Sequence, residues 1–330
     1  MDSALPTPVL SVENLKVHYR VRGTRPWQRH NVVRAVDDVS FTIGTAETLG
    51  LVGESGCGKS SAGRAIAQLV APTAGRIMLA DVDLTALSPR QLRRHRRDVQ
   101  IVFQDPTSSL NPRMTVAELL SEPLEIAGLS RTAIRQRVNE LIDVISFASY
   151  HLSRYPHEFS GGQKQRIGIA RALALQPRVL VCDEPVSALD VSVQAQIVNL
   201  LKDIQARLHL SYLFIAHDLG VVRQVSDRIA VMYLGRIMEI GRRDQVYARP
   251  RHPYTQALLS AAPRVRRANE VAIPRTILAG DLPSPIDPPS GCPFHTRCPK
   301  VQAVCMAATP ELRDLGDGRR AACHFAETDQ

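Results

Sequence analysis

The chain has 330 residues, enough for one large domain or two ordinary ones, and its 44% hydrophobic and 22% charged residues are typical of a globular protein. No run approaches the roughly 18 uninterrupted apolar residues of a membrane span. Residues 1–9 lack the basic segment and apolar core of a secretory signal, so we expect a cytosolic protein. The formal net charge of +9 permits nucleotide, nucleic acid or anionic lipid as partners. The densest basic run, at 90–97, has no interleaved aromatic residues for base stacking, so we interpret it as a solvated helix face and expect no nucleic-acid partner.

The first 70 residues are predicted to form strands, then a glycine-rich loop and a helix. Apolar residues alternate at 9–17 and 33–43, and an apolar run covers 48–52. Helical spacing follows at 59–70. Residues 53–60, between that strand and that helix, read GESGCGKS. They fit the phosphate-binding loop pattern G-x-x-x-x-G-K-[ST], which requires this strand–loop–helix context.

The loop residues have the chemistry needed to hold a nucleoside triphosphate. The glycines allow positive φ and let backbone N–H groups approach phosphate oxygens at the N-terminus of the following helix. Lys59 would reach the β- and γ-phosphates, and Ser60 would offer its hydroxyl to Mg²⁺. We therefore expect contacts with ATP along the whole loop, from Gly53, Glu54, Ser55, Gly56, Cys57, Gly58, Lys59, Ser60 and Ser61.

Residues 105–176 are predicted to be mainly helical and to interrupt an α/β core. A strand candidate at 99–103 precedes them. Apolar periodicity of the helical kind covers 116–126, 134–145 and 163–175. Strand and helix then alternate again, with strands at 179–182, 212–216 and 229–232 and a helix at 191–208. This alternation predicts an α/β fold with a helical insertion.

Two carboxylates follow the buried strand predicted at 179–182. In open α/β sheets, ligand sites lie at the carboxyl ends of the strands, and Asp183 and Glu184 occupy such a position. Asp183 would hold Mg²⁺ directly or through water. Glu184 could act as a general base on an attacking water, a role worth roughly 10²–10⁴-fold in rate.

The chain changes character after residue 263. Six prolines between 281 and 299 disfavour regular helix or central strand, so we expect irregular structure there. Four of the six cysteines also gather in this region, at Cys292, Cys298, Cys305 and Cys323. In a cytosolic protein such crowding favours a metal site over disulfides. The spacing C-x5-C-x6-C-x17-C alone does not choose between Zn²⁺ and a [4Fe–4S] cluster, and His295 and His324 are additional candidate ligands.

Together these motifs resemble the ATPase subunits of ATP-binding cassette (ABC) transporters. Residues 249–258, which contain the sequence HPYT, are similar to the oligopeptide/dipeptide import family within them. The resemblance covers nearly the whole chain, from about residue 9 to residue 324. It implies an ABC nucleotide-binding domain at 1–262, built from a phosphate-loop core, an N-terminal antiparallel β subdomain and a helical subdomain at about 105–176. A Cys-rich extension with a four-cysteine metal site would follow at 263–330.

The resemblance also assigns roles to individual residues. Gln104 matches the Q-loop glutamine, which contacts Mg²⁺ and the attacking water, and His217 matches the switch histidine. The implied catalytic set is Glu184, His217 and Gln104, and the implied Mg²⁺ set is Ser60, Gln104 and Asp183. Tyr19 fits the aromatic position that stacks on adenine. Two further segments complete the family pattern: the signature Ser160, Gly161, Gly162 and Gln163, and the D-loop Ser187, Ala188, Leu189 and Asp190.

In this family the signature contacts ATP held by the opposite subunit, so two cassettes meet head to tail. The resemblance implies a second ABC ATPase subunit in a heterodimer, with a homodimer as the alternative, together with two transmembrane permeases and an extracytoplasmic peptide-binding protein. It places the chain peripherally on the cytoplasmic face of the inner membrane. ATP and Mg²⁺ are the implied cofactors, together with a [4Fe–4S] cluster at the four cysteines or, as the alternative, structural Zn²⁺.

Two other functions are open to the same residues. A soluble ABC ATPase acting on nucleic acid or ribosomes is compatible with the basic charge. However, the chain carries a single cassette and its HPYT-to-cysteine tail favours the importer. A regulatory metal-binding protein with a vestigial ATPase is disfavoured by the presence of Glu184 and His217. The transported substrate cannot be read from this chain.

Overall fold

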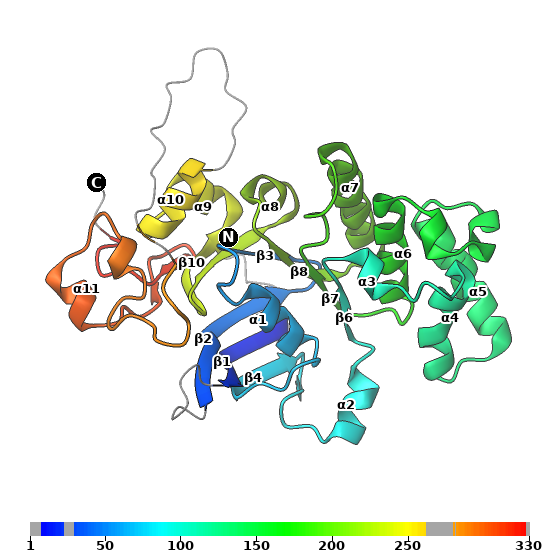
Figure 1. The fold of residues 1–330 in the computed structure, drawn as a ribbon, viewed down its shortest axis with the longest axis horizontal. Helices are drawn as coiled ribbons and strands as arrows, with labels where there is room; N and C mark the ends of the chain where they lie inside the picture. Colours follow the sequence, from blue (N-terminus) through cyan, green and yellow to red (C-terminus); the bar gives the residue numbers. More distant parts are fainter. Residues whose placement is uncertain (1–7, 23–29, 262–279, 281, 328–330) are drawn as a thin grey trace, which may run out of the picture.

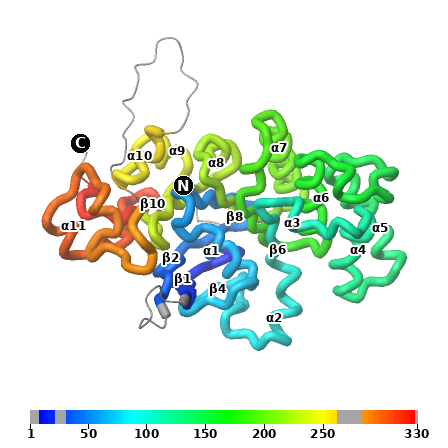
Figure 2. Tube along the Cα trace, viewed as in Figure 1, coloured from blue at the N-terminus to red at the C-terminus, as the bar shows by residue number. Residues whose placement is uncertain are grey.

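The computed structural model describes residues 8–22, 30–261, 280 and 282–327. Its strands form two sheets, with α1 (Lys59–Ile66) in contact with strands of both (Figure 1). The predicted α/β fold is confirmed, with the helical insertion at one end of the long axis and the C-terminal extension at the other (Figure 2). The domain boundary predicted at 262–263 lies at residues that the structure does not describe.

The smaller sheet is antiparallel and has the order β2-β1-β4-β5. Its two long strands extend the predicted ones at both ends, and the two shorter strands were not predicted. The bounds are β1 Pro8–Arg22, β2 His30–Gly44, β4 Ala74–Leu79 and β5 Val82–Asp83. This sheet is the predicted N-terminal β subdomain.

The larger sheet has the order β11-β12-β10-β9-β3-β8-β7-β6. Its centre is parallel: β3 pairs with β8 and β9, and β7 pairs with β8 and β6. The parallel strands are β3 Thr48–Val52, β6 Val99–Val102, β7 Val179–Asp183, β8 Ser211–Ala216 and β9 Arg228–Tyr233. Because these strands run in one direction, the segments that follow β3, β6, β7 and β8 meet at one edge of the sheet.

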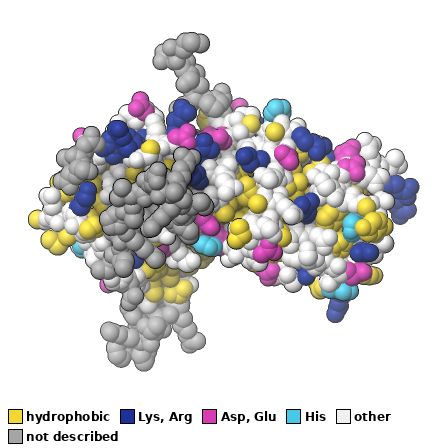
Figure 3. Space-filling model, turned by 90° about the horizontal axis from the view of Figure 1, so that it is seen from above, with side chains coloured by type: hydrophobic (Ala, Val, Ile, Leu, Met, Phe, Trp, Pro, Cys, Tyr) yellow, Lys and Arg dark blue, Asp and Glu magenta, His cyan; other side chains and the backbone are white. Residues whose placement is uncertain are grey.

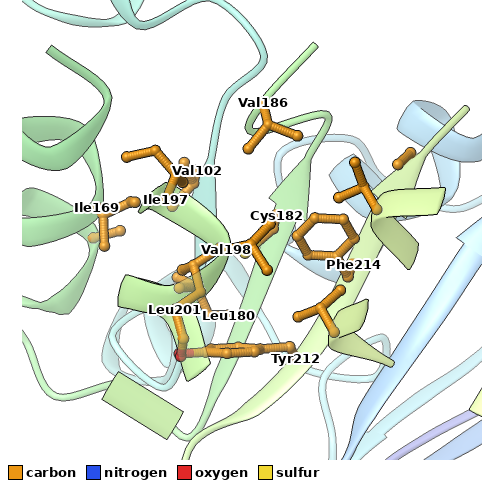
Figure 4. Close-up of a cluster of buried hydrophobic side chains, with 14 of the residues drawn as sticks. Val102, Ile169, Leu180, Cys182, Val186, Ile197, Val198, Leu201, Tyr212 and Phe214 are labelled. Atoms are coloured by element: carbon orange, nitrogen blue, oxygen red, sulfur yellow. The ribbon is translucent and has the colours of Figure 1, made fainter. Parts of the chain in front are cut away.

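Apolar residues on both faces explain why the central strands are buried. Every residue of β7, VLVCD, is buried, as expected for a parallel strand covered by helices on both sides. Cys182 lies between Leu180 and Phe214 in one core cluster, where α7 (Val191–Leu208) contributes Ile197 and Leu201 (Figure 4). Such packing fixes the ends of the strands, and therefore the loops that carry the motifs.

The predicted helical insertion is confirmed. It comprises α3 Pro106–Ser109, α4 Val116–Ile126, α5 Arg131–Val144 and α6 Gly161–Leu173, with two 3₁₀ turns at Ser149–Ser153 and Pro156–Glu158. Most of the basic run at 90–97 lies in helix α2 (Pro89–His95), which has no buried residue. This agrees with its interpretation as a solvated helix face. On the face drawn in Figure 3, Lys and Arg side chains are interspersed with acidic ones.

Helix α8 (Leu219–Val225) lies before β9, and α9 (Arg243–Ala248) and α10 (Pro253–Ala261) follow β10 (Arg236–Arg242). In the described part of the proline-rich stretch at 281–299, the 3₁₀ turn His295–Arg297 is the only helix or strand, so this stretch is irregular as expected. Beyond 282 the chain adds α11 (Ala303–Ala307) and two short strands, β11 (Arg313–Asp314) and β12 (Arg320–Ala321). Since β12 pairs with β10, the extension continues the main sheet. Among the described residues, no helix has the length and apolar character needed to cross a membrane.

Candidate functional site

The phosphate-binding loop follows β3 and runs into α1, as its motif requires. Gly58 occupies the N-cap position of α1 with φ 105°, and a Cβ there would lie 1.8 Å from the Ala35 carbonyl oxygen. At Gly53 a Cβ would lie 2.1 Å from the Met232 carbonyl oxygen. Both positions therefore demand glycine for steric reasons as well as for backbone conformation. The loop leaves the N–H groups of the helix start available to an anion.

Lys59 lies inside this loop. Its side chain is buried, and its ammonium donates to the carbonyl oxygens of Gly53 at 2.8 Å and Glu54 at 3.0 Å. These bonds fix the Lys59 ammonium within the loop that opens the N-terminus of α1, so the loop presents a positive site for phosphate.

Ser60 and Asp183 lie together although 123 residues separate them. The Ser60 hydroxyl donates to Asp183 Oδ1 at 2.7 Å, across the ends of α1 and β7. Asp183 is buried, and burial raises the pKa of its carboxyl. A hydroxyl and a carboxylate are oxygen ligands of the kind that Mg²⁺ prefers, so this pair could hold the ion.

Three predicted catalytic residues come together at the carboxyl edge of the sheet. Glu184 Oε2 lies 3.0 Å from Gln104 Nε2 and 3.2 Å from His217 Nδ1. Gln104 follows β6, Glu184 follows β7 and His217 follows β8. Glu184 has a φ of 48° and donates its N–H to the Ile215 carbonyl oxygen at 2.9 Å, so the β8 backbone fixes its unusual conformation. The arrangement can orient a water molecule and accept its proton.

The signature residues form the N-terminus of α6. Ser160 accepts the Gln163 N–H and Gln163 Oε1 accepts the Ser160 N–H, which is a reciprocal capping box. Gly162 packs against α7, where a Cβ would lie 2.3 Å from Val193 Cγ1. In the described part of the chain, none of the hydrogen bonds made by Ser160 or Gln163 reaches the phosphate loop.

The D-loop connects Glu184 to α7. Ser187 donates to the Glu184 carbonyl oxygen at 3.1 Å, and Asp190 caps α7 by accepting the Val193 N–H. Between them Ala188 is exposed and Leu189 is half-buried. The D-loop is therefore tied directly to the backbone that carries Glu184.

Tyr19 lies apart from the loops on the antiparallel sheet. It is half-buried in β1, opposite Val33 of β2, and packs against the core shared by the two sheets. The structure does not by itself assign it a ligand.

The structure adds one contact that the sequence motifs do not contain. Arg297, in the C-terminal extension, donates from both Nη atoms to the Glu54 carboxylate of the phosphate loop, at 2.7 and 3.2 Å. The two residues are 243 positions apart and Arg297 belongs to none of the nucleotide motifs, so no local sequence signal could have paired them.

The four clustered cysteines line one cavity of about 970 Å³, together with His295 and His324. None forms a disulfide. Burial raises the pKa of Cys292 to about 11, with a further contribution from the other three thiols. The predicted metal site is nevertheless not confirmed. Within the residues that the structure describes, no three or more His, Cys, Asp or Glu side chains are grouped so that they could hold a metal ion.

Comparison with known families gives two matches along the chain. Residues 36–187 match the ABC transporter family, and residues 238–305 match the family described as oligopeptide/dipeptide transporter, C-terminal region. Among relatives, the oligopeptide transport ATP-binding protein AppF of Bacillus subtilis is 47% identical over 98% of this chain and 99% of its own length. A peptide import ATP-binding protein of Brucella ovis is 51% identical over 96% of this chain and 98% of its own.

Solved structures give the same fold. The ATP-binding cassette MJ0796, in a dimeric post-hydrolysis state bound to ADP and Pi, superposes with a TM-score of 0.62 at 28% identity, over 71% of this chain and 98% of that one. The cbiO1 protein of Clostridium perfringens, part of the ABC transporter complex cbiONQ, superposes with a TM-score of 0.64 at 27% identity. The match covers 74% of this chain and 92% of cbiO1.

Proposed function

This chain belongs to the ATP-binding subunits of the oligopeptide/dipeptide ABC transporter family, and from that membership we propose that its ATP hydrolysis energises the import of di- or oligopeptides into a prokaryotic cell. As a member of the family it is an ABC ATPase. The observation that carries the proposed chemistry is the convergence of Gln104 and His217 on one oxygen of Glu184, beside the Ser60–Asp183 pair.

In the proposed reaction, Lys59 and the loop amides would hold the phosphates of ATP, and Ser60, Asp183 and Gln104 would hold Mg²⁺. The ion would neutralise charge on the β- and γ-phosphates. Glu184 Oε2 accepts a proton from water as the water oxygen bonds to the γ-phosphorus. The bond from that phosphorus to the bridging oxygen breaks and ADP leaves. His217 and Gln104 orient Glu184 and the water.

The signature is proposed to act on a second subunit. Ser160, Gly161, Gly162 and Gln163 open α6, so this helix offers a further N-terminal anion site. Head-to-tail pairing would bring this N-terminus to the ATP held by the other cassette, with the D-loop residues 187–190 at the interface. The dimeric state of MJ0796 bound to ADP and Pi supports such an assembly. We propose a sister ATPase as the partner and Tyr19 as the residue that stacks on adenine.

Import requires further components. We propose that two permeases bind this chain at the cytoplasmic face of the inner membrane, near residues 105–125, and that an extracytoplasmic binding protein delivers the peptide. The peptide import and oligopeptide transport names of the relatives support this assignment. The proposal includes no nucleic-acid partner.

The four cysteines are proposed to hold a [4Fe–4S] cluster, with structural Zn²⁺ as the alternative. Reduced thiols on a shared cavity have the chemistry for either, because soft thiolates suit iron–sulfur clusters and zinc. No group of ligands able to hold a metal ion is formed among the described residues, so the proposal requires the four side chains to move together on loading. The group would stabilise a proline-rich segment that has little apolar core of its own.

Replacing Glu184 by Gln tests the proposed function. Glu184→Gln keeps the shape of the side chain but cannot accept a proton, so ATP turnover by the purified subunit should fall by roughly 10²–10⁴-fold while ATP binding is retained. Uptake of a labelled dipeptide or oligopeptide by cells that carry only this variant should fall in parallel. Asp203→Asn, which also removes one carboxylate, at an exposed position of α7 away from the proposed permease contact, is the control.

The two readouts separate the two parts of the proposal. Unchanged ATP turnover in Glu184→Gln would show that Glu184 is not the general base. Lost turnover with unchanged peptide uptake would leave the ATPase chemistry in place and contradict the import role.

A further inference from the structure

The C-terminal extension contacts the phosphate loop through an ion pair. Arg297 Nη1 lies 2.7 Å from Glu54 Oε2, and Nη2 lies 3.2 Å from Oε1, so the guanidinium binds the carboxylate with two parallel hydrogen bonds. The side chains are 9% and 29% exposed, respectively. At this low exposure, water screens the pair less than it screens a surface salt bridge.

The fold of the extension fixes the position of Arg297. The residue ends the 3₁₀ turn His295–Arg297, and its N–H donates to the Phe294 carbonyl oxygen at 3.1 Å. Phe294 is fully buried, and its ring centroid lies 5.3 Å from those of both Tyr233 and Tyr254. These aromatic contacts anchor the turn to the end of β9 and to α10.

The same aromatic cluster also holds the backbone of the loop. Tyr254, in the HPYT segment, accepts the Glu54 N–H through its hydroxyl oxygen at 2.9 Å. Glu54 is therefore held through its backbone by α10 and through its side chain by the extension. Its carbonyl oxygen in turn accepts the Lys59 ammonium at 3.0 Å.

Glu54 poses an electrostatic difficulty at this place. It is the carboxylate within residues 53–60, the loop that is proposed to hold a triphosphate of several negative charges. An unpaired carboxylate there would repel the ligand, and it would also compete for Lys59. The pair with Glu54 raises the pKa of the Arg297 guanidinium, which therefore stays charged and neutralises the carboxylate.

We propose that Arg297 is a positioning residue for the nucleotide site. It neutralises Glu54 and fixes the orientation of this side chain, so that the loop can accept the phosphates of ATP. The inference rests on the proposed role of the loop in binding ATP. It gives the C-terminal extension a direct part in nucleotide affinity.

Nucleotide binding by a charge-removal series tests this role. Equilibrium titration with the fluorescent analogue mant-ATP gives Kd for Arg297→Gln, Glu54→Gln and the double variant in the full chain. Arg297→Gln should weaken binding roughly tenfold, equivalent to about 1.4 kcal/mol. The double variant should bind within roughly twofold of the wild type, because it removes the carboxylate together with its partner.

The double variant distinguishes positioning from simple support of the fold. If Arg297 only stabilised the extension, removal of Glu54 as well would not restore affinity, and that result would overturn the proposal. An unchanged Kd in Arg297→Gln would overturn it too. Arg297→Lys keeps the charge without the two-pronged geometry and should weaken binding by a smaller factor, roughly threefold. It therefore tests the proposal even if the Gln variant fails to fold, and wild-type affinity in it would contradict the positioning role.

Two controls complete the series. Arg135→Gln, at an exposed position of α5, removes the same charge far along the chain and should leave Kd unchanged. Lys59→Ala should abolish binding. Wild-type affinity in Lys59→Ala would remove the proposed role of the loop itself, whereas loss of binding in Lys59→Ala with wild-type affinity in Arg297→Gln would overturn only the role of Arg297.

Discussion

His252 is a buried titratable residue that starts a helix. It is 1% exposed, and its Nδ1 accepts the Tyr254 N–H at 3.0 Å in the first turn of α10. Its own N–H donates to the buried carboxylate of Glu239 at 2.9 Å. Burial lowers the pKa of His252 to about 3, so the ring is neutral in the folded protein near neutral pH.

This lowered pKa predicts a loss of stability in mild acid. Below about pH 6.5 the unfolded chain takes up a proton on His252 while the folded chain does not, so stability falls as the pH falls. Between pH 7 and pH 5 the wild type should lose about 2 kcal/mol more unfolding free energy than His252→Asn. Asn can still accept the Tyr254 N–H as a helix N-cap. Urea unfolding at the two pH values measures the difference, and equal losses in the two proteins would contradict the prediction.

The candidate site shows what sequence can predict at the scale of residues. Gln104, Glu184 and His217 each follow a strand of a parallel sheet, so motif and topology together were enough to place them at one edge. Glu54 was expected only as part of the phosphate loop. Its contact with Arg297 depends on how the extension packs against the phosphate loop. No sequence pattern around either residue indicates that the two are in contact.

Helices α6 and α7 pack closely because the first turn of α6 contains glycine. A Cβ at Gly162 would lie 2.3 Å from Val193 Cγ1, and the stiff β-branched side chain has little freedom to move away. Gly168, further along the same helix, would place a Cβ with no atom within 4 Å. Substitution of Gly162 therefore tests the packing of α6 against α7, whereas substitution of Gly168 tests helix propensity alone.

Alanine at these two positions should have opposite effects on stability. Gly162→Ala should lower the unfolding free energy by about 1–3 kcal/mol through overpacking. Gly168→Ala should raise it by up to about 1 kcal/mol, since alanine favours helix over glycine. Thermal and urea unfolding measure both. Val193→Ala should recover stability in the Gly162→Ala background, and a failure to recover would show that contact with Val193 is not the cause.

The elements missed by sequence patterns are mostly short. β5, β11 and β12 have two residues each, too few to show a period, and they form because longer neighbours offer partners. The long strands β1 and β2 and the helices α4, α5 and α6 were predicted because their apolar spacing persists over several turns or repeats. The proline-rich stretch at 281–299 is irregular as expected where it is described, but further along the extension β12 pairs with β10 and extends the main sheet, which no local pattern predicted.

At the scale of the whole molecule, the extension and the nucleotide core are joined at several points. β12 continues the large sheet through β10, the Arg34 N–H donates to the Pro285 carbonyl oxygen at 3.0 Å, and Arg297 binds Glu54. Arg297 lies between Cys292 and Cys298 in sequence and immediately precedes Cys298. Any group that holds the cysteines together would therefore also hold Arg297 in place.

The proposed cluster can be tested by the metal content of the wild type and of a cysteine variant. Protein purified without oxygen should contain iron and acid-labile sulfide, and Cys298→Ala should lose both. Stoichiometric zinc without iron would support the alternative metal, and the absence of both would contradict a metal site.

Loss of the cluster should also weaken nucleotide binding. Without the cluster the turn that carries Arg297 would be less constrained, so Cys298→Ala should raise Kd for mant-ATP, by up to the roughly tenfold change expected of Arg297→Gln. Val301→Ala, an exposed position between two of the cysteines, is the control. In a chain that already carries Arg297→Gln and Glu54→Gln, Cys298→Ala should change Kd little, since the contact it acts through is gone. An equal effect in both backgrounds would show that the cysteines influence the nucleotide site by another route.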